Sequence, residues 1–166
     1  MYIDLRSDTV TQPTPEIREA MCRAKVGDDV MDCDPTVSRL EEMSAEMLGK
    51  EAGMFVPSGT QSNLCALLSH CERGDEYLVG QTAHTYLFEG GGAAVFGSIQ
   101  PQSLDQEEDG TLALDKLAAL VKPDDFHFAR TKLLCLENTT WGKVLPLDYL
   151  KLVQSFASDY QLSLHL

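Results

Sequence analysis

The segments that most constrain the fold are strand-like and helix-like stretches that alternate from residue 53 to the end of the chain. Residues 132–137 contain an apolar run, which is typical of a parallel strand covered on both faces of its sheet. Alternation of this kind predicts an α/β fold with a mainly parallel sheet. The hydrophobic periods predict strands at 53–57, 76–80, 95–99, 132–137 and 162–166, helices at 60–71, 84–90, 115–121 and 147–160, and a flexible joint at 90–92.

Two more helices are expected before this region. Thr14-Pro15 and Asp34-Pro35 each place a capping side chain before a proline, and the second pattern ends at Gly49. The buried side of the first helix is expected to carry Ile17, Met21 and Ala24. We therefore expect residues 1–50 to form a helical arm and linker, and residues 51–166 to form the α/β part.

The charge of the chain argues against a nucleic-acid partner. Lys and Arg number 13 against 26 Asp and Glu, so the formal net charge is −13, and the basic residues form no stripe. No stretch approaches the roughly 18 apolar residues of a membrane span, and the first residues lack the apolar core of a signal sequence. Five cysteines without a C-x-x-C pair favour reduced thiols in a cytoplasmic protein, and their spacing predicts no metal site.

Residues 56–63, Val-Pro-Ser-Gly-Thr-Gln-Ser-Asn, carry the strongest binding signal. Ser58, Gly59 and Thr60 stand where a helix begins, so backbone N–H groups without helical partners and the positive end of the helix dipole favour an anion. Glycine lets a ligand approach that backbone closely. The segment predicts an anion site, most simply for a phosphate. An ordinary turn in which Thr60 caps the helix stays open as the alternative.

Two of the four histidines are candidates for chemistry. His84 follows a predicted strand, at the edge where ligands gather in parallel sheets, and His127 lies just before the 132–137 strand. His70 and His165 fall within an amphipathic helix and an apolar strand, where a structural role is the simpler interpretation. Residues 4–9 are unusually polar, and a solvated arm is the alternative to a functional segment there.

Together these motifs carry a family resemblance. In order along the chain they are Asp4-Leu5-Arg6-Ser7-Asp8-Thr9-Val10-Thr11, Val26-Gly27-Asp28-Asp29-Val30, Asp34-Pro35-Thr36, Val56-Pro57-Ser58-Gly59-Thr60, His84, Asp124-Asp125-Phe126-His127-Phe128-Ala129-Arg130-Thr131 and Leu136-Glu137-Asn138-Thr139. The set resembles the low-specificity L-threonine aldolases, in the β-eliminating lyase branch of the pyridoxal-phosphate enzymes. The resemblance extends over essentially the whole chain.

The resemblance implies a fold, a reaction and a set of site residues. The fold is the large domain of the aspartate-aminotransferase type (fold type I), and the reaction cleaves threonine or allo-threonine to glycine and acetaldehyde. Ser58, Gly59 and Thr60 would hold the phosphate of pyridoxal 5′-phosphate, and the His84 ring would stack on its pyridine ring. His84 and His127 would act near the substrate hydroxyl, and Ser7 would bind the substrate carboxylate. Family members are homo-oligomers, tetramers built as dimers of dimers.

The chain also departs from the family pattern. It ends before the Asp-Gly-Ala-Arg and Ser-Lys-Gly segments of the family, so we expect a truncated chain without the cofactor lysine and the small C-terminal domain, inactive by itself. Met31-Asp32-Cys33 and Thr140-Trp141 also replace residues typical of site-lining loops. Two alternatives follow: a non-catalytic remnant that serves as a binding or assembly module, or another pyridoxal-phosphate lyase.

Overall fold

The computed structural model describes residues 3–31 and 33–166. Asp32, in the middle of the Met31–Cys33 departure, lies outside the described residues, as do the first two residues of the chain. The chain divides into two compact units, one that ends at Phe55 and one that runs from Val56 to Leu166.

The first unit holds the two helices that the capping pattern predicts. It contains two short 3₁₀ helices, η1 (Asp8–Val10) and η2 (Asp29–Met31), and two α-helices, α1 (Pro15–Arg23) and α2 (Pro35–Leu48). Thr14 caps α1, and the Asp34 carboxylate accepts hydrogen bonds from two N–H groups in the first turn of α2. Gly49 ends α2 in the left-handed conformation, with φ at 62°. The predicted capping residues therefore set both helix starts.

The expected buried face of α1 is not observed. No residue of α1 is buried, and Ile17 and Met21 are 50% and 67% exposed. The same holds for most of α2, where only Ala45 is buried. Helical periodicity identifies the face that can be covered, but it does not say whether another element covers it. The prediction for Ile17 and Met21 was wrong for this reason.

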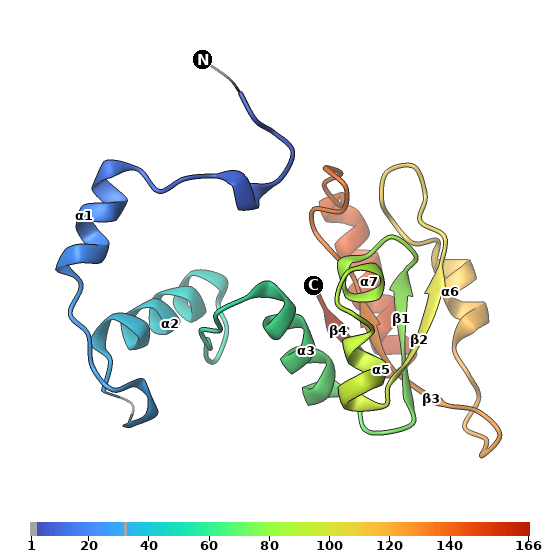
Figure 1. The fold of residues 1–166 in the computed structure, drawn as a ribbon. Helices are drawn as coiled ribbons and strands as arrows, with labels where there is room; N and C mark the ends of the chain where they lie inside the picture. Colours follow the sequence, from blue (N-terminus) through green and yellow to red (C-terminus); the bar gives the residue numbers. More distant parts are fainter. Residues whose placement is uncertain (1–2, 32) are drawn as a thin grey trace. The chain divides into compact units, whose positions relative to one another are not determined.

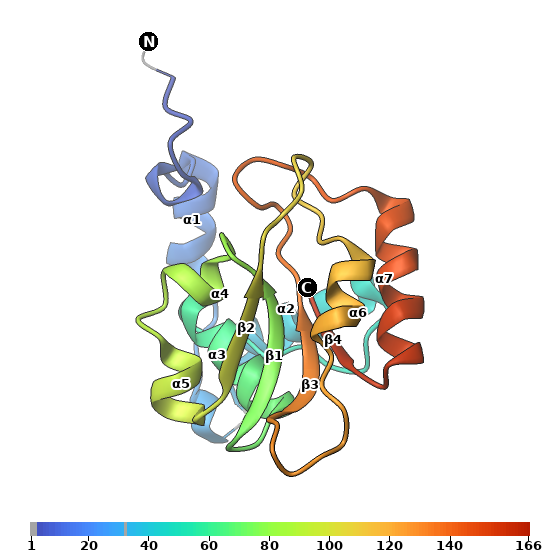
Figure 2. The ribbon, with the colours of Figure 1, turned by 90° about the vertical axis from the view of Figure 1, so that its right-hand side faces the viewer.

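The second unit is a four-stranded parallel sheet with helices on both faces (Figures 1 and 2). The strands lie in the order β2-β1-β3-β4. The elements in chain order are α3 (Gly59–His70), β1 (Asp75–Gly80), α4 (His84–Leu87), α5 (Gly92–Gly97), β2 (Gln100–Leu104), α6 (Leu114–Leu120), β3 (Arg130–Cys135), α7 (Leu147–Asp159) and β4 (Ser163–His165). The predicted α/β class with a parallel sheet is confirmed.

The core consists of two apolar layers, one on each face of the sheet. Leu78 and Leu134 face α6 and α7 and pack with side chains such as Leu117 and Val153. Tyr77 and Val79 point to the opposite face, where α3 and α5 cover them (Figure 2). All six residues of β1 are buried, so the central strand is covered from both sides.

Two of the predicted strands are wrong. Residues 53–57 form no strand, because their backbone is bound to α2: the Phe55 N–H donates to Glu41 Oε1 at 2.6 Å. A Cβ on Gly53 would also lie 2.8 Å from the Glu41 carbonyl oxygen, so only glycine allows this approach.

Residues 95–99 contain the end of α5 rather than a strand, and the strand β2 begins at Gln100. Ser98, with φ at 52°, ends the helix in the left-handed conformation. In the predicted joint, Gly90 and Gly91 form a left-handed turn, with φ at 61° and 68°, and Gly92 begins α5. β2 is polar because it lies at the edge of the sheet, so it lacks the apolar signal on which the prediction depended.

Within the described part of the chain, no helix combines the length and the apolar character that crossing a bilayer demands.

We expect a polypeptide of these 166 residues alone to self-associate, because large apolar side chains stay exposed along α2. They are Leu40, Met43, Met47 and Leu48. Light scattering after size exclusion should show oligomers, and calorimetry a broad transition. The double variant Met47→Glu with Leu48→Lys should shift the population toward monomer, and the charge swap Glu46→Lys with Lys50→Glu is the matched control. A monomeric wild type with a sharp, reversible transition would contradict this expectation.

Candidate functional site

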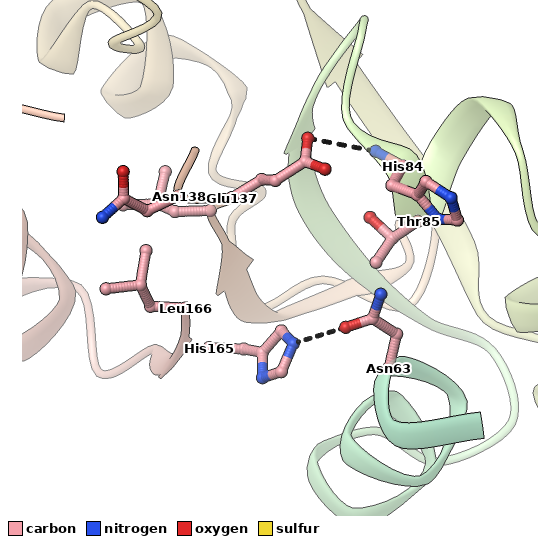
Figure 3. A pocket seen from close by; sticks show the side chains of 8 residues that line it. Asn63, His84, Thr85, Glu137, Asn138, His165 and Leu166 are labelled. Carbon is pink, nitrogen blue, oxygen red and sulfur yellow. Dashed lines mark hydrogen bonds between the residues drawn. The ribbon is translucent and has the colours of Figure 1, made fainter. Parts of the chain in front are cut away.

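A cavity of about 150 Å³ opens at the carboxyl ends of the strands (Figure 3). The loop after β1 leads to His84, the loop after β3 carries Glu137 and Asn138, and His165 is the last residue of β4. Asn63, from α3, completes the polar lining. Parallel strands thus bring residues from four distant segments to one edge, as the sequence predicts for a ligand site.

The predicted anion segment forms the first turn of α3. Ser58 caps this helix, and its Oγ accepts a hydrogen bond from the Gln61 N–H at 3.2 Å. Thr60, the capping residue of the simpler alternative, lies inside the helix instead. A Cβ placed on Gly59 would meet no atom within 4 Å, so the space above this backbone is open. The helix presents free N–H groups and room for a ligand at its positive end.

His84 lies at the start of α4 and is held at two points. Its main-chain N–H donates to Glu137 Oε2 at 3.2 Å, which joins the loops after β1 and β3. Its imidazole Nδ1 lies 2.8 Å from Glu89 Oε1. The Glu89 side chain is 4% exposed, whereas that of His84 is half-exposed. The imidazole is therefore partly open to solvent, while one of its ring nitrogens contacts a buried carboxylate.

The hydrogen-bond chain continues from Glu89 to the last strand. Asn63 Nδ2 donates to the same Glu89 oxygen at 2.7 Å, and Asn63 Oδ1 lies 3.2 Å from His165 Nε2. Four side chains from α3, α4, the loop after it and β4 are joined in this way. Figure 3 shows Asn63 and His165 facing each other beside the cavity.

A second network fixes the loops above the sheet. Thr140, which is buried, donates to Glu137 Oε2 at 3.2 Å and accepts from Gln106 Nε2 at 3.2 Å. Gln106 Oε1 in turn accepts from the Thr82 N–H at 3.1 Å. The loops that follow β1, β2 and β3 are therefore tied to one another, which holds Glu137 and, through it, the backbone of His84.

An aromatic row extends from His84 along the same edge. The Phe88 ring lies with its centroid 5.5 Å from that of His84 and 6.0 Å from that of Trp141. The Trp141 indole N–H donates to the Thr82 carbonyl oxygen at 3.0 Å. Thr140-Trp141, noted as a departure from the family, thus contributes one buried hydroxyl and one exposed ring next to the site.

His127 is not brought to this edge within one copy of the chain. It precedes β3, so it lies at the amino end of the strands, whereas His84 follows β1 at the carboxyl end. Its Nδ1 lies 2.7 Å from Asp125 Oδ1, and its side chain is 66% exposed. A role for His127 near the substrate hydroxyl stays a prediction.

Ser7 belongs to the first unit, where its Oγ caps η1 by accepting from the Thr9 N–H at 3.2 Å. The same hydroxyl lies 2.8 Å from Thr9 Oγ1. Its expected contact with the substrate carboxylate also stays a prediction.

Sequence reasoning missed three residues of the hydrogen-bond chain. His165 was interpreted as structural, but it lines the cavity, and its place at the end of a strand was an available signal. Asn63 belongs to the 56–63 segment, but nothing in that segment singled it out, and Glu89 carried no signal, since a polar residue after a helix is usually solvated. Only the packing of α3 and α4 brings them together.

Comparison with known proteins assigns the family. The family model for β-eliminating lyases matches residues 4–166. The chain belongs to the β-eliminating lyase family. It is 64% identical over 163 residues to the low specificity L-threonine aldolase of Escherichia coli K12, covering 98% of this chain and 49% of that protein. It is 46% identical over 170 residues to the probable low-specificity L-threonine aldolase 2 of Arabidopsis thaliana, covering 99% and 48%.

The fold agrees with the family. The structure of a Leishmania major threonine aldolase superposes with a TM-score of 0.81 at 20% identity, covering 93% of this chain and 46% of that one. At this identity the likeness shows the fold alone. The chain thus has the pyridoxal-phosphate-enzyme fold of the threonine aldolases, and it spans about half the length of the curated relatives it matches.

We expect acid to destabilise the fold through His165. Burial of the imidazole, and next the charge of His70, hold the pKa of His165 below its ordinary value of 6.5, which Glu89 offsets in part. Below pH 6.5, His165 is protonated in the unfolded chain before it is protonated in the folded chain. The contribution of His165 to the free energy of unfolding is therefore fully present above this pH and is lost as the pH falls.

The urea midpoint should accordingly drop more between pH 7.5 and pH 5.5 in the wild type than in His165→Gln, which has no imidazole to protonate. An equal drop in both proteins would show that His165 is not a source of the acid sensitivity.

Proposed function

We propose that this chain forms the phosphate-binding and imidazole-bearing half of a pyridoxal-phosphate lyase that cleaves β-hydroxy-α-amino acids. Threonine and allo-threonine are the proposed substrates, and glycine and acetaldehyde the products. One observation carries the proposal: α3, through Asn63, and α4, through His84, share one cavity at the carboxyl edge of the sheet. The proposal is supported by 64% identity to a low specificity L-threonine aldolase.

The residues of the α3 N-terminus fit pyridoxal 5′-phosphate. Ser58, Gly59 and Thr60 would hold the phosphate, because the helix dipole favours a dianion there and Gly59 leaves open space above its backbone. His84, half-exposed beside the same cavity, would lie against the pyridine ring. When bound, the cofactor draws off the electron pair left at Cα as the Cα–Cβ bond breaks.

The remaining work falls to this chain's own side chains. Cleavage requires a base that takes the proton of the β-hydroxyl group, and an imidazole is suited to this near neutral pH. His84 Nε2, on the side of the ring away from Glu89, is the proposed acceptor. On the resemblance, His127 would assist near the hydroxyl and Ser7 would bind the substrate carboxylate.

Further features follow from the resemblance. Residues 1–50 would serve as an arm and linker, and residues 51–166 as the first part of the cofactor-binding large domain. The active protein would be a homo-oligomer, a dimer of dimers, working in cytoplasmic amino acid metabolism.

The proposal is tested by a chimera that joins these 166 residues to the half of the Escherichia coli aldolase that they do not match. We expect the chimera to release glycine and acetaldehyde from threonine when pyridoxal phosphate is present. The 166-residue polypeptide alone should show no turnover, because none of the described residues that line the cavity is a lysine, so they offer the cofactor no amine to bind. A chimera that folds and binds the cofactor but leaves threonine intact would favour the alternative of a binding module.

In the same chimera, Gly59→Val should weaken pyridoxal-phosphate binding at least tenfold. A Cβ at this position meets no protein atom within 4 Å, so we expect the fold to be kept, but the added side chain occupies the space proposed for the phosphate. Calorimetric titration measures the change. Leu147→Val, at the exposed first residue of α7, is the matched control and should bind as the wild type does. Unchanged affinity in Gly59→Val would place the phosphate elsewhere.

A further inference from the structure

We propose that Glu89 is a positioning residue that holds the His84 imidazole in the tautomer protonated at Nδ1, so that Nε2 is free to accept a proton. The observation is the 2.8 Å contact between His84 Nδ1 and a Glu89 carboxylate that is 4% exposed. The use of Nε2 as a base rests on the proposed function, whereas the tautomer itself does not.

The direction of each hydrogen bond follows from what a carboxylate can do. An ionised carboxylate only accepts, so His84 Nδ1 must carry the hydrogen in its contact with Glu89 Oε1. The same oxygen lies 2.7 Å from Asn63 Nδ2, and this amide nitrogen is the only donor of the Asn63 side chain. Glu89 therefore receives two hydrogen bonds on one oxygen, in a site that little water reaches.

The orientation of Asn63 then fixes His165. Because its amide nitrogen faces Glu89, its oxygen faces His165 Nε2 at 3.2 Å, and this oxygen can only accept. His165 Nε2 must carry the hydrogen, and its Nδ1 does not take part in the chain. Each hydrogen bond thus has one direction: His165 donates to Asn63, and both Asn63 and His84 donate to Glu89. No member can reverse its bond without leaving a neighbour unpaired.

This arrangement prepares His84 for proton transfer. A proton taken up at Nε2 gives the ring a positive charge beside the buried Glu89 carboxylate, where little water weakens the attraction. The main-chain N–H of His84, bound to Glu137, fixes the backbone from which the ring projects. A base fixed in tautomer and orientation is ready without rearrangement.

A second imidazole–carboxylate pair shows what burial adds. His127 Nδ1 lies 2.7 Å from Asp125 Oδ1, nearly the same distance, but its side chains are 66% and 45% exposed. Water competes for both partners there, and among the described residues no third side chain hydrogen-bonds to Asp125. The His127 pair is therefore the natural control for the His84 pair.

The tautomer is measured by two-bond ¹H–¹⁵N correlation spectra of the chimera that joins these 166 residues to the second half of the Escherichia coli aldolase, produced with ¹⁵N-labelled histidine. His84 is assigned by the signal that disappears in His84→Gln. We expect the wild type to be protonated at Nδ1. Glu89→Leu should move His84 to the form protonated at Nε2, and Glu89→Gln should keep the wild-type form, because an amide oxygen still accepts. Asp125→Asn should leave the His84 signals in place.

A wild-type His84 protonated at Nε2 would overturn the proposal, as would an unchanged tautomer in folded Glu89→Leu. If Glu89→Leu does not fold, the wild type and Glu89→Gln still decide, since both must show Nδ1–H. Threonine cleavage is assayed separately in the same preparations, where Glu89→Leu should lower kcat at least tenfold with little change in KM. The expected tautomer without any cleavage would refute the proposed function alone, and cleavage by a protein with Nε2–H would refute the positioning role alone.

Discussion

The pairing of β1 with β3 is the interaction on which the rest of the structure depends. Their parallel register places Leu78 beside Leu134 in the apolar layer under α6 and α7, and Tyr77 and Leu133 in the layer under α3 and α5. Buried on both faces, the two strands cannot shift by one residue without moving each apolar side chain to the wrong layer. The same register sets the two loops that follow the strands side by side.

Charged residues secure this register at the amino end of the strands. Asp75 and Arg130, paired across β1 and β3, form an ion pair of 2.7 Å, and Glu76, fully buried, accepts from Thr131 at 2.9 Å and pairs with Lys122 at 3.3 Å. A buried carboxylate without partners would be costly, so these pairs favour one alignment over its neighbours. These pairs lie at the amino ends of the strands, whereas the open site lies at their carboxyl ends.

The sequence predicted those parts of the molecule that depend on local patterns. Thr14 and Asp34 were identified as caps because a side-chain oxygen before a proline meets the needs of a helix start wherever it occurs. The strand β3 was identified by its apolar run. β2 was missed and residues 53–57 were wrongly predicted as a strand, because a polar edge strand and a segment bound to Glu41 are decided by partners elsewhere in the chain. The helix start at Ser58 and the place of His84 after a strand were predicted correctly because these patterns are local too, and the roles of both residues stay predictions.

What the sequence by itself determined is therefore the α/β class, the family motifs and the helix start that offers N–H groups to an anion. What only the tertiary structure decided is which polar groups meet. Asn63, Glu89 and His165 come together because α3 packs on α4 and on the sheet, and no spacing in the sequence encodes that contact. Likewise, His84 and His127 were equal candidates in the sequence. His84 follows β1 and His127 precedes β3, so in a parallel sheet they lie at opposite ends of the strands. Hydrogen bonds act over about 3 Å, so the groups that share them are chosen by the packing of the folded chain.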